Sequence, residues 1–225
     1  MCGRYFWKDD AEDAFLEDFP DLAGVVRRLR AGDYTPGMSA TALAAGASDG
    51  AATGSVGAAA AAGGIGANRT AGTIGSGSGI HVESLLWGFP GFDKGKLLIN
   101  ARAESVKDRP TFADSFAGRR CALPAAGFYE WDKKKEKVIF TLPDKPILYL
   151  AGVYRPYGAE NRFVVLTREA NASMELVHDR MPLILSGEEV IPWVSDAAKA
   201  GDLLTKELPM LKAERPYEQI AFEFE

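Results

Sequence analysis

Apolar residues recur at helical spacing in two short stretches near the start of the chain. In the first stretch they fall on one face behind an aspartate that suits a helix N-cap, Asp9 or Asp10, and the second stretch repeats the spacing. The pattern predicts two short helices before residue 40. Their apolar positions are Ala11, Ala14, Phe15 and Phe19, followed by Leu22, Val25, Val26 and Leu29.

Beyond residue 80 the pattern changes to short runs that are rich in β-branched or aromatic residues and separated by Gly, Pro and Asp, which is typical of strands. No alternation of strands with long helices demands parallel crossovers, so we expect an α+β fold with a mainly antiparallel sheet. Two further short helices are expected at about Asn171 to His178 and Ala197 to Lys206. The predicted strands are Leu85 to Phe89, Leu97 to Asn100, Val138 to Leu142, Ile147 to Tyr154 and Phe163 to Thr167.

One segment, from about Ala40 to Gly79, consists almost wholly of Ala, Gly, Ser and Thr. Asp49 and Arg69 are its charged side chains, and it shows neither helical nor strand periodicity. Such a composition is typical of a flexible linker. We therefore predict a flexible insertion at about residues 40–79 that connects two parts of one fold and has no chemistry of its own.

The length of 225 residues, with 47% hydrophobic and 10% aromatic residues, predicts a single globular domain over residues 1–225. The net charge of -5 argues against a protein that coats nucleic acid through bulk electrostatics, so any DNA binding must be local. Small basic clusters are more often solvated surface than binding sites. Three such clusters are present: Arg27, Arg28 and Arg30; Arg119 and Arg120; and Lys133, Lys134, Lys135 and Lys137.

The N-terminal residues contain no apolar stretch of the kind that a signal peptide needs, and no segment reaches the roughly 20 apolar residues of a membrane span. We therefore expect a cytoplasmic protein, or a nuclear one in a eukaryote. Two cysteines, Cys2 and Cys121, and two histidines give neither a disulfide framework nor metal-ligand spacing. The expectation is two reduced thiols, no metal, no other cofactor and a monomer.

Cys2 would carry an amine and a thiol on one residue once Met1 is removed, a step that is common when the second residue is small. An α-amine has a pKa of about 7.7 to 8.0, against about 10.4 for lysine, so much more of it is neutral at pH 7. It can attack an aldehyde, and the thiol can then add to the same carbon to close a five-membered thiazolidine. The matched substrate is therefore an aldehyde. The alternative is an ordinary cysteine behind a retained Met1.

Three segments further along combine polar and aromatic residues. Asn100 and Arg102 are two apart, so they share a face if the strand from residue 97 continues. Glu130 lies between aromatic residues, where loss of solvent would raise its pKa towards a value useful for proton transfer. His178 titrates near neutrality and precedes Arg180 by two residues. Taken singly, each also fits a structural role: a turn residue, a paired surface acid, or a cation at a helix end.

Together with the N-terminus, these segments resemble the SOS response-associated peptidase (SRAP) family, whose members shield abasic sites. The resemblance runs from Met1 to about Trp193 and is interrupted by the insertion. It implies one α+β domain with a barrel-like sheet. The matching segments, in order, are Met1-Cys2-Gly3-Arg4-Tyr5, Leu86-Trp87-Gly88-Phe89, Ile99 to Ser105, Arg120 to Trp131, and His178-Asp179-Arg180-Met181-Pro182.

The resemblance implies that Cys2 forms a covalent crosslink to the open-chain aldehyde of an abasic site in single-stranded DNA, within the DNA damage response. It implies that Asn100 hydrogen-bonds the adduct, that Glu130 moves protons at the amine, and that His178 acts at the sugar oxygen to favour the aldehyde. Contacts to the DNA are implied for a second group, in which Trp87 would pack where the strand is kinked. This group is Gly3, Arg4, Pro36, Trp87, Arg102, Thr167 and Arg180.

Two other functions stay open. In a thiol peptidase or N-terminal-nucleophile hydrolase, Cys2 would attack an amide with its own amine as base, and Asn100 would stabilise the oxyanion. Self-cleavage that frees Cys2 would use the same residues and is compatible with crosslinking and with a lyase-like activity. In a noncatalytic module that binds single-stranded DNA, the aromatic residues and arginines would suffice. A covalent bond to DNA separates crosslinking from the binding module, and a peptide panel tested against an abasic oligonucleotide separates crosslinking from the peptidase.

Overall fold

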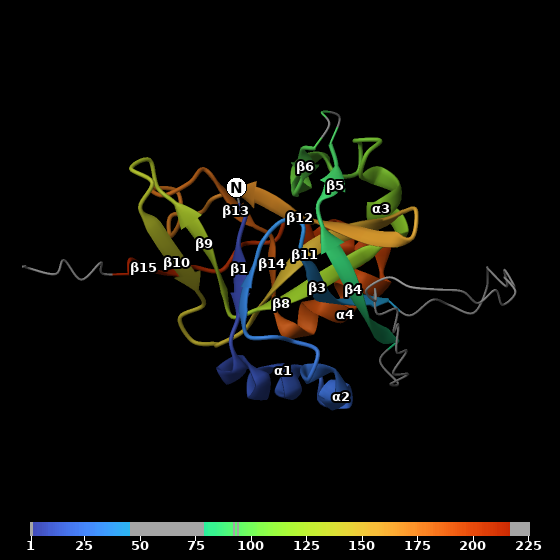
Figure 1. Cartoon of the computed structure of the whole chain (residues 1–225), viewed down its shortest axis with the longest axis horizontal. Coiled ribbons are helices and arrows are strands. Elements are labelled where there is room, and N and C mark those ends of the chain that lie inside the picture. Colours follow the sequence, from blue (N-terminus) through green and yellow to red (C-terminus); the bar gives the residue numbers. More distant parts are fainter. Residues whose placement is uncertain (1, 46–78, 92, 94, 217–225) are drawn as a thin grey trace, which may run out of the picture.

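The computed structural model describes residues 2–45, 79–91, 93 and 95–216 and contains a closed barrel of five strands. The barrel strands are β3 (Ser39–Ala45), β4 (Ile80–Trp87), β8 (Arg120–Ala125), β11 (Leu148–Tyr157) and β12 (Glu160–Glu169). They pair in the cyclic order β3, β4, β12, β11, β8 and back to β3 (Figure 1). The β4–β12 pairing is parallel and the other four are antiparallel. The predicted α+β fold with a mainly antiparallel, barrel-like sheet is confirmed.

A second sheet lies beside the barrel, on the left in Figure 1. Its strands, in spatial order, are β15 (Lys212–Glu214), β10 (Lys137–Thr141), β9 (Gly127–Trp131), β1 (Tyr5–Trp7) and β2 (Gly32–Tyr34). The chain passes from the barrel into this sheet between β8 and β9, at Gly127. A Cβ atom there would lie 2.5 Å from the carbonyl oxygen of Phe140 and 2.6 Å from the ring of Phe6. Only glycine allows so close an approach of the strands.

Short strands extend the barrel sheet at the end where the N-terminus lies. β7 (Asn100–Arg102) runs parallel to β12, and β13 (Arg180–Pro182) runs antiparallel to it. Thr167 of β12 is in register with Arg102 of β7 on one side and with Pro182 of β13 on the other. β7 and β13 are therefore neighbours of the same strand, with β12 between them. The remaining short strands are β14 (Ile184–Leu185), which pairs with β11, and β5 (Phe89–Pro90) and β6 (Leu97–Leu98), which pair with each other.

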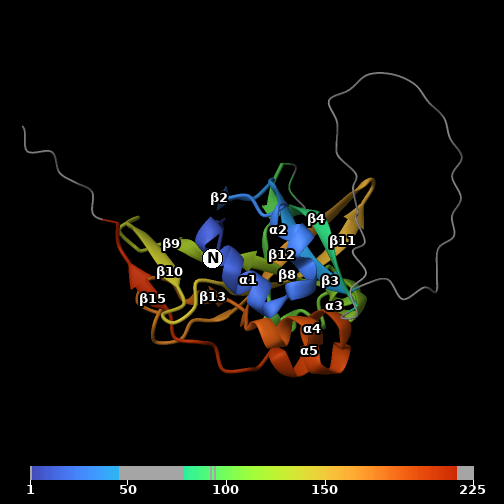
Figure 2. The ribbon, with the colours of Figure 1, turned by 90° about the horizontal axis from the view of Figure 1, so that it is seen from below.

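Helices cover the lower end and one side of the barrel (Figures 1 and 2). The two predicted N-terminal helices are confirmed, although each combines a 3-10 turn with a short α-helix, and so is the predicted helix from residue 197. None of the described helices has the length and apolar character that crossing a bilayer would require. The helices are α1 (Glu12–Asp18), α2 (Ala23–Val26), α3 (Ala113–Gly118), α4 (Gly187–Ser195) and α5 (Ala197–Leu203), with 3-10 turns at Asp9–Ala11, Pro20–Leu22 and Ala103–Ser105.

The helix predicted for Asn171 to His178 is wrong, because these residues form successive turns. The Asn171 side chain accepts hydrogen bonds from the backbone and hydroxyl of Ser173, which fixes a turn at the position where a helix would start. Leu176 is 87% exposed, so the segment has no continuous apolar face to bury. His178 therefore lies at the end of a loop and not at the C-terminus of a helix.

The predicted insertion at residues 40–79 starts too early. Residues up to 45 belong to β3, where Ala42, Leu43 and Ala44 are fully buried, so both faces of this strand are covered. Residues 46–78 lie outside the described residues. Ala45 and Ile80 are partners in the β3–β4 register, so the two ends of this segment are adjacent.

Deleting residues 46–78 and joining Ala45 to Gly79 through a short Gly-Ser linker should leave the fold intact. The strand register already holds Ala45 and Ile80 together, and a tenfold shorter loop changes the closure free energy by only about 2 kcal/mol, in favour of folding. Thermal unfolding of the deletion variant should remain cooperative, with a midpoint at or above that of the full chain. A lower midpoint or a loss of cooperativity would show that the segment contributes to stability.

Arg120 is buried and does not belong to a basic surface cluster. Its exposed fraction is 4%, and its guanidinium donates to the carbonyl oxygens of Phe116 and Ala117 in α3 and of Trp193 and Val194 in α4. Five donors in a planar fork suit this multiple capping of carbonyl groups near two helix ends. Neighbouring Arg119 is half-buried, so this pair of arginines does not form a phosphate-binding patch.

Candidate active site and nucleic-acid interface

The N-terminal segment lies along β9, which brings Cys2 close to Glu130. The backbone N–H of Tyr129 donates to the carbonyl oxygen of Arg4 at 2.9 Å, and Tyr5 is in register with Phe128. Cys2 is fully buried. This burial, together with the nearby Glu130 carboxylate, raises the pKa of its thiol to about 12. The thiol is therefore neutral at pH 7 and must lose its proton to another group when it reacts.

Asn100 makes a direct contact with Cys2 across a long separation in sequence. Its Nδ2 donates to the carbonyl oxygen of Cys2 at 3.0 Å, while its Oδ1 is buried and has no hydrogen-bond partner among the described residues. In β7 only Ala101 is buried, so Asn100 and Arg102 share the other face, as predicted from their spacing. Asn100 thus fixes the Cys2 peptide and keeps one acceptor for a further donor.

Glu130 is a buried carboxylate near the end of β9. It is 5% exposed, and its Oε1 is 3.5 Å from the backbone nitrogen of Trp131, a long hydrogen bond. The Val138 backbone lies opposite Glu130 in the sheet. A carboxylate that is shielded from water and close to a neutral thiol has the chemistry of a general base for that thiol.

The imidazole of His178 is oriented by a backbone group. Its Nδ1 accepts from the backbone N–H of Arg180 at 2.9 Å and also lies 2.9 Å from a carboxylate oxygen of Asp179. A backbone N–H can only donate, so Nδ1 is the acceptor and the neutral ring carries its proton on Nε2. The Asp179 carboxylate is 88% exposed and becomes the partner of Nδ1 only if the ring is fully protonated. This tautomer offers Nε2–H as a proton donor.

Arg180 is held in a fork by Glu104, a residue for which the sequence alone predicts no role. The two guanidinium nitrogens donate to the Glu104 carboxylate at 2.7 and 2.8 Å, and one also donates to the carbonyl oxygen of Thr167 at 2.5 Å. These hydrogen bonds from Arg180 lower the pKa of Glu104 below its ordinary value. The sequence feature that could have indicated a role for Glu104 is its position two residues after Arg102, in a segment that also contains Asn100.

Arg4 and Arg102 reach the surface, and each is two residues from a member of the Cys2–Asn100 contact. The Arg4 guanidinium lies 5.5 Å from the centre of the Trp131 ring and 3.6 Å from the carboxylate of Asp33. Arg102 is exposed at the end of β7, and no ion pair joins it to another residue in the described part of the chain. Arginines placed in this way can bind phosphates even on an acidic protein.

Two of the residues predicted to contact DNA are below the surface, which corrects those predictions. Trp87 is fully buried, with its ring 5.3 Å from that of Tyr5 and its Nε1 donating to the carbonyl oxygen of Ile99. It therefore cannot act as a wedge between bases, and instead packs behind the site and fixes the backbone next to Asn100. The side chain of Thr167 is also fully buried.

Pro36 and Gly3 keep a surface position. Pro36 is half-buried in a turn that the N–H of Met38 closes onto the carbonyl oxygen of Thr35, and Gly3 is half-buried beside Cys2. The structure thus brings Asn100 and Glu130 to Cys2, and it places Arg180 of β13, with His178 just before it, across β12 from β7. No group of three or more His, Cys, Asp or Glu side chains in the described part of the chain could hold a metal ion.

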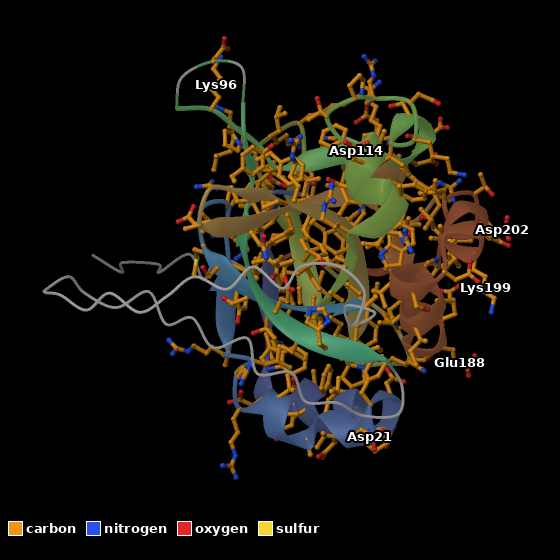
Figure 3. The ribbon with its side chains drawn as sticks, turned by 90° about the vertical axis from the view of Figure 1, so that its right-hand side faces the viewer. Asp21, Lys96, Asp114, Glu188, Lys199 and Asp202 are labelled. Atoms are coloured by element: carbon orange, nitrogen blue, oxygen red, sulfur yellow. The ribbon has the colours of Figure 1, made fainter. Side chains whose placement is uncertain are left out.

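The acidic residues of the C-terminal helices lie away from the N-terminus. Figure 3 shows Glu188 and Asp202 at the margin of the molecule, on α4 and α5, the side that faces right in Figure 1. The N-terminus lies left of centre at the top of Figure 1. The net charge of -5 includes these distant acids, so by itself it does not give the charge around Cys2, where both arginines and carboxylates lie.

Comparison with curated proteins gives relatives in bacteria and vertebrates. The chain is 31% identical over 142 residues to the abasic site processing protein YoaM of Bacillus subtilis, covering 57% of this chain and 63% of YoaM. It is 32% identical over 123 residues to the abasic site processing protein YedK of Escherichia coli, covering 51% and 55%. With the abasic site processing protein HMCES of Xenopus tropicalis it shares 28% over 151 residues, covering 55% and 43%. Each match spans less than two thirds of the relative.

Solved structures share the fold over almost the whole chain. A phage-related protein from Bordetella bronchiseptica superposes with a TM-score of 0.67 at 22% identity, covering 96% of this chain and 94% of that one. A second protein from the same organism gives a TM-score of 0.66 at 19% identity, covering 96% and 100%. The family model described as SOS response associated peptidase matches residues 1–220. This match over nearly the full length shows that the chain belongs to the SOS response associated peptidase (SRAP) family.

Proposed function

We propose that this protein captures abasic sites in single-stranded DNA by forming a covalent thiazolidine crosslink through Cys2, after removal of Met1. The observation that carries the proposal is the convergence of two side chains on Cys2. Asn100 donates to its carbonyl oxygen at 3.0 Å, and the Glu130 carboxylate is close enough to its thiol to raise the thiol pKa. The names of the curated relatives, which are abasic site processing proteins, support the same substrate.

The reaction needs no oxidant or reductant. The neutral α-amine of Cys2 attacks C1′ of the open-chain deoxyribose, and the resulting carbinolamine loses one water to form an imine. The thiol then adds across the carbon–nitrogen double bond, so that a carbon–sulfur bond forms and the thiol proton ends on the ring nitrogen. Both nucleophiles are on one residue, so the second step is intramolecular and closes a five-membered ring.

The surrounding residues divide the work of binding and proton transfer. Glu130 accepts the proton of the neutral thiol and returns it to the ring nitrogen. The buried Oδ1 of Asn100 is an acceptor for the Cys2 amine, and its Nδ2 holds the Cys2 peptide. His178 donates through Nε2–H to the sugar ring oxygen and so favours the open aldehyde. Arg4, Arg102 and Arg180 bind phosphates.

The order of the nucleophiles separates crosslinking from peptide hydrolysis. A thiol peptidase attacks its amide with the thiol, whose pKa is raised here to about 12 by burial and the Glu130 carboxylate, so it needs a base from the first step. The crosslinking reaction begins with the amine and uses the thiol only after the imine has formed. Self-cleavage that removes Met1 can still use the same residues. A noncatalytic binding module would not need a carboxylate buried beside a thiol.

Incubation with three substrates tests the proposal. We expect an adduct that resists heat and detergent with single-stranded DNA carrying one abasic site, and none with the undamaged strand. A peptide panel should show no turnover. Peptide cleavage without an adduct would favour the peptidase function, and reversible binding without either product would favour the binding module.

Glu104→Gln should tighten the binding of undamaged single-stranded DNA about fivefold. The slope of log K against log salt concentration should steepen by about 0.7, the value for one neutralised phosphate. The carboxylate of Glu104 now occupies the Arg180 fork, and its lowered pKa keeps it ionised at neutral pH. Fluorescence anisotropy at several salt concentrations measures the change. Asp108→Asn, which alters the net charge equally at an exposed acid, is the control. Equal or weaker binding by Glu104→Gln would contradict this competition.

A further inference from the structure

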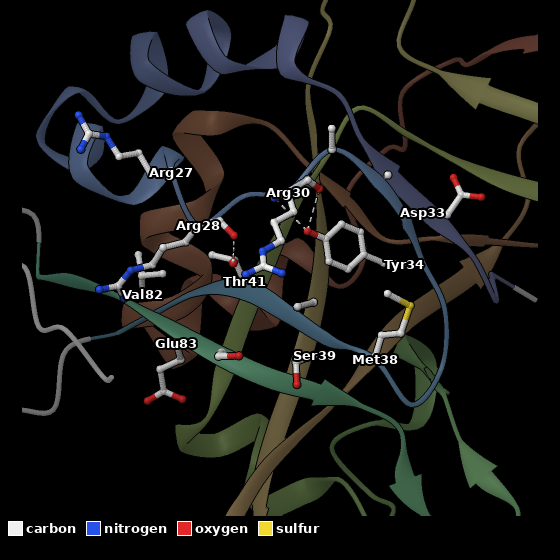
Figure 4. Close-up of a pocket in the computed structure, with 14 residues that line it drawn as sticks. Arg27, Arg28, Arg30, Asp33, Tyr34, Met38, Ser39, Thr41, Val82 and Glu83 are labelled. Carbon is white, nitrogen blue, oxygen red and sulfur yellow. Dashed lines mark hydrogen bonds between the residues drawn. The ribbon is translucent and has the colours of Figure 1, made fainter. Parts of the chain in front are cut away.

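The arginine cluster near the N-terminus borders a groove of about 580 Å³, the arginine groove, on the side of the barrel (Figure 4). The segment that follows α2 forms one wall, and the outer faces of β3 and β4 form the other. Its polar lining consists of Arg27, Arg28, Arg30, Asp33, Tyr34, Ser39, Thr41, Glu83 and Ser84.

Three arginines and two carboxylates line the arginine groove, and one of the carboxylates, that of Asp33, also pairs with Arg4. The carboxylate of Glu83 is 2.7 Å from His81 and 3.4 Å from the amide of Asn161, and that of Asp33 accepts from the Tyr129 hydroxyl at 2.9 Å and pairs with Arg4. In contrast, Arg27 and Arg30 are exposed, and no carboxylate in the described part of the chain forms an ion pair with either. The groove therefore favours an anion.

The backbone that carries these arginines is fixed in place. The Tyr34 hydroxyl donates to the carbonyl oxygen of Arg30 at 3.0 Å and accepts from its N–H at 3.2 Å, while Thr41 Oγ1 donates to the carbonyl oxygen of Arg28 at 3.2 Å. The Tyr34 ring stacks on Tyr5 with centroids 5.0 Å apart. In Figure 4 the Arg30 side chain extends towards Thr41, into the groove. A preformed site of this kind loses little entropy when it binds.

The arginine groove is connected to the Cys2 site through β1 and β2. Asp33 lines the groove and also pairs with Arg4, two residues from Cys2, and β2 is hydrogen-bonded to β1 along its length. A strand that binds at Cys2 and Arg4 can therefore continue past Asp33 into the groove. Its exposed arginines and hydroxyl groups suit successive phosphate groups of an extended chain.

We infer that the arginine groove is a second phosphate-binding site, which holds the backbone of the single strand flanking the nucleotide that reacts at Cys2. This inference rests on the proposed function and deepens it: the groove extends the length of DNA that is bound and takes no part in the chemistry. The ligand class is a phosphodiester chain, bound through charge and without selection among bases.

Binding of undamaged oligothymidylates of two lengths tests the inference. For the double variant Arg27→Ala/Arg30→Ala, we expect about tenfold weaker binding of a strand of about 16 nucleotides. The slope of log K against log salt concentration should be flatter by about 1.4, because two phosphates are no longer neutralised. A strand of about five nucleotides should bind as it does to wild type. Lys199→Ala/Arg109→Ala, which removes two exposed cations elsewhere, should leave both affinities unchanged.

Equal affinities of the double variant and wild type for the long strand would overturn the inference, as would an equal loss for both lengths. ATP and inorganic pyrophosphate are tested separately. If wild type binds either of them and the double variant does not, while DNA binding shows no effect of length, the groove is a site for small anions and the inference is overturned. Crosslinking to abasic DNA at saturating protein should be unchanged in the double variant. If wild type forms no adduct but the double variant still loses affinity only for the long strand, the proposed function is rejected and the phosphate-binding role of the groove is retained.

Discussion

Cys2→Ala is expected to give no adduct that survives heat and detergent with single-stranded DNA carrying one abasic site. Alanine keeps an α-amine for a reversible imine but has no thiol to close the ring, so the bond hydrolyses during denaturation. A denaturing gel after single-turnover incubation measures the loss. Cys121→Ala, which removes the other buried thiol from a barrel strand, should retain the adduct and serves as the matched control.

Cys2→Ser separates the two steps of the same reaction. A hydroxyl is a poorer nucleophile than a thiol for closing the ring, so this variant should give at most a slow, reducible imine. Equal adduct from wild type and Cys2→Ala would move the nucleophile elsewhere, for example to a lysine. Circular dichroism of each variant establishes that the fold is retained, since Cys2 is a buried residue.

Glu130→Gln should slow crosslinking by roughly 10² to 10⁴ at saturating protein, the usual contribution of general acid–base catalysis. The change keeps the shape of a side chain that is 5% exposed, and the affinity for undamaged single-stranded DNA should stay within about twofold. Rapid-quench crosslinking beside equilibrium binding measures both quantities. Arg102→Ala should show the opposite pattern, with weaker binding, a flatter salt dependence and a wild-type rate at saturation.

The direction of the Glu130→Gln effect also separates two roles of the carboxylate. Its charge raises the pKa of the Cys2 thiol, so its removal lowers that pKa and makes the thiolate easier to form. If the charge acted only on the thiol pKa, Glu130→Gln would crosslink at least as fast as wild type. A slower reaction requires that the carboxylate itself accepts and returns a proton. A wild-type or faster rate would contradict the role assigned to Glu130.

The elements with clear periodicity could be predicted from the sequence, and the elements set by tertiary contacts could not. The apolar spacing around Phe15 and Val25 is sufficient for short helices, and the runs of apolar and aromatic residues at 147–154 and 163–167 coincide largely with barrel strands. The helix α4 was missed because Pro192 lies inside it. Its capping box, in which Glu189 contacts the backbone of Ser186, is what starts the helix.

Candidate site residues could be selected from the sequence, but their contacts could not. The two-residue spacing of Asn100 and Arg102 indicated their common face, because that follows from strand geometry. The contact between Asn100 and Cys2 depends on the whole barrel and has no local signal. Burial of Trp87 is also a tertiary property, and for this reason a residue taken for a DNA contact proved to be part of the core. Glu104 was missed because an exposed acid acquires a role only through the arginine opposite it.

The mass of the purified crosslink tests the central claim most directly. We predict the mass of the chain without Met1, plus that of the oligonucleotide, minus one water, with fragmentation placing the DNA on Cys2. An imine has the same mass, so denatured adduct is also treated with iodoacetamide: a closed thiazolidine leaves Cys121 as the thiol that is alkylated. An adduct that retains Met1, maps to another residue or leaves the Cys2 thiol open to alkylation would contradict the proposed chemistry.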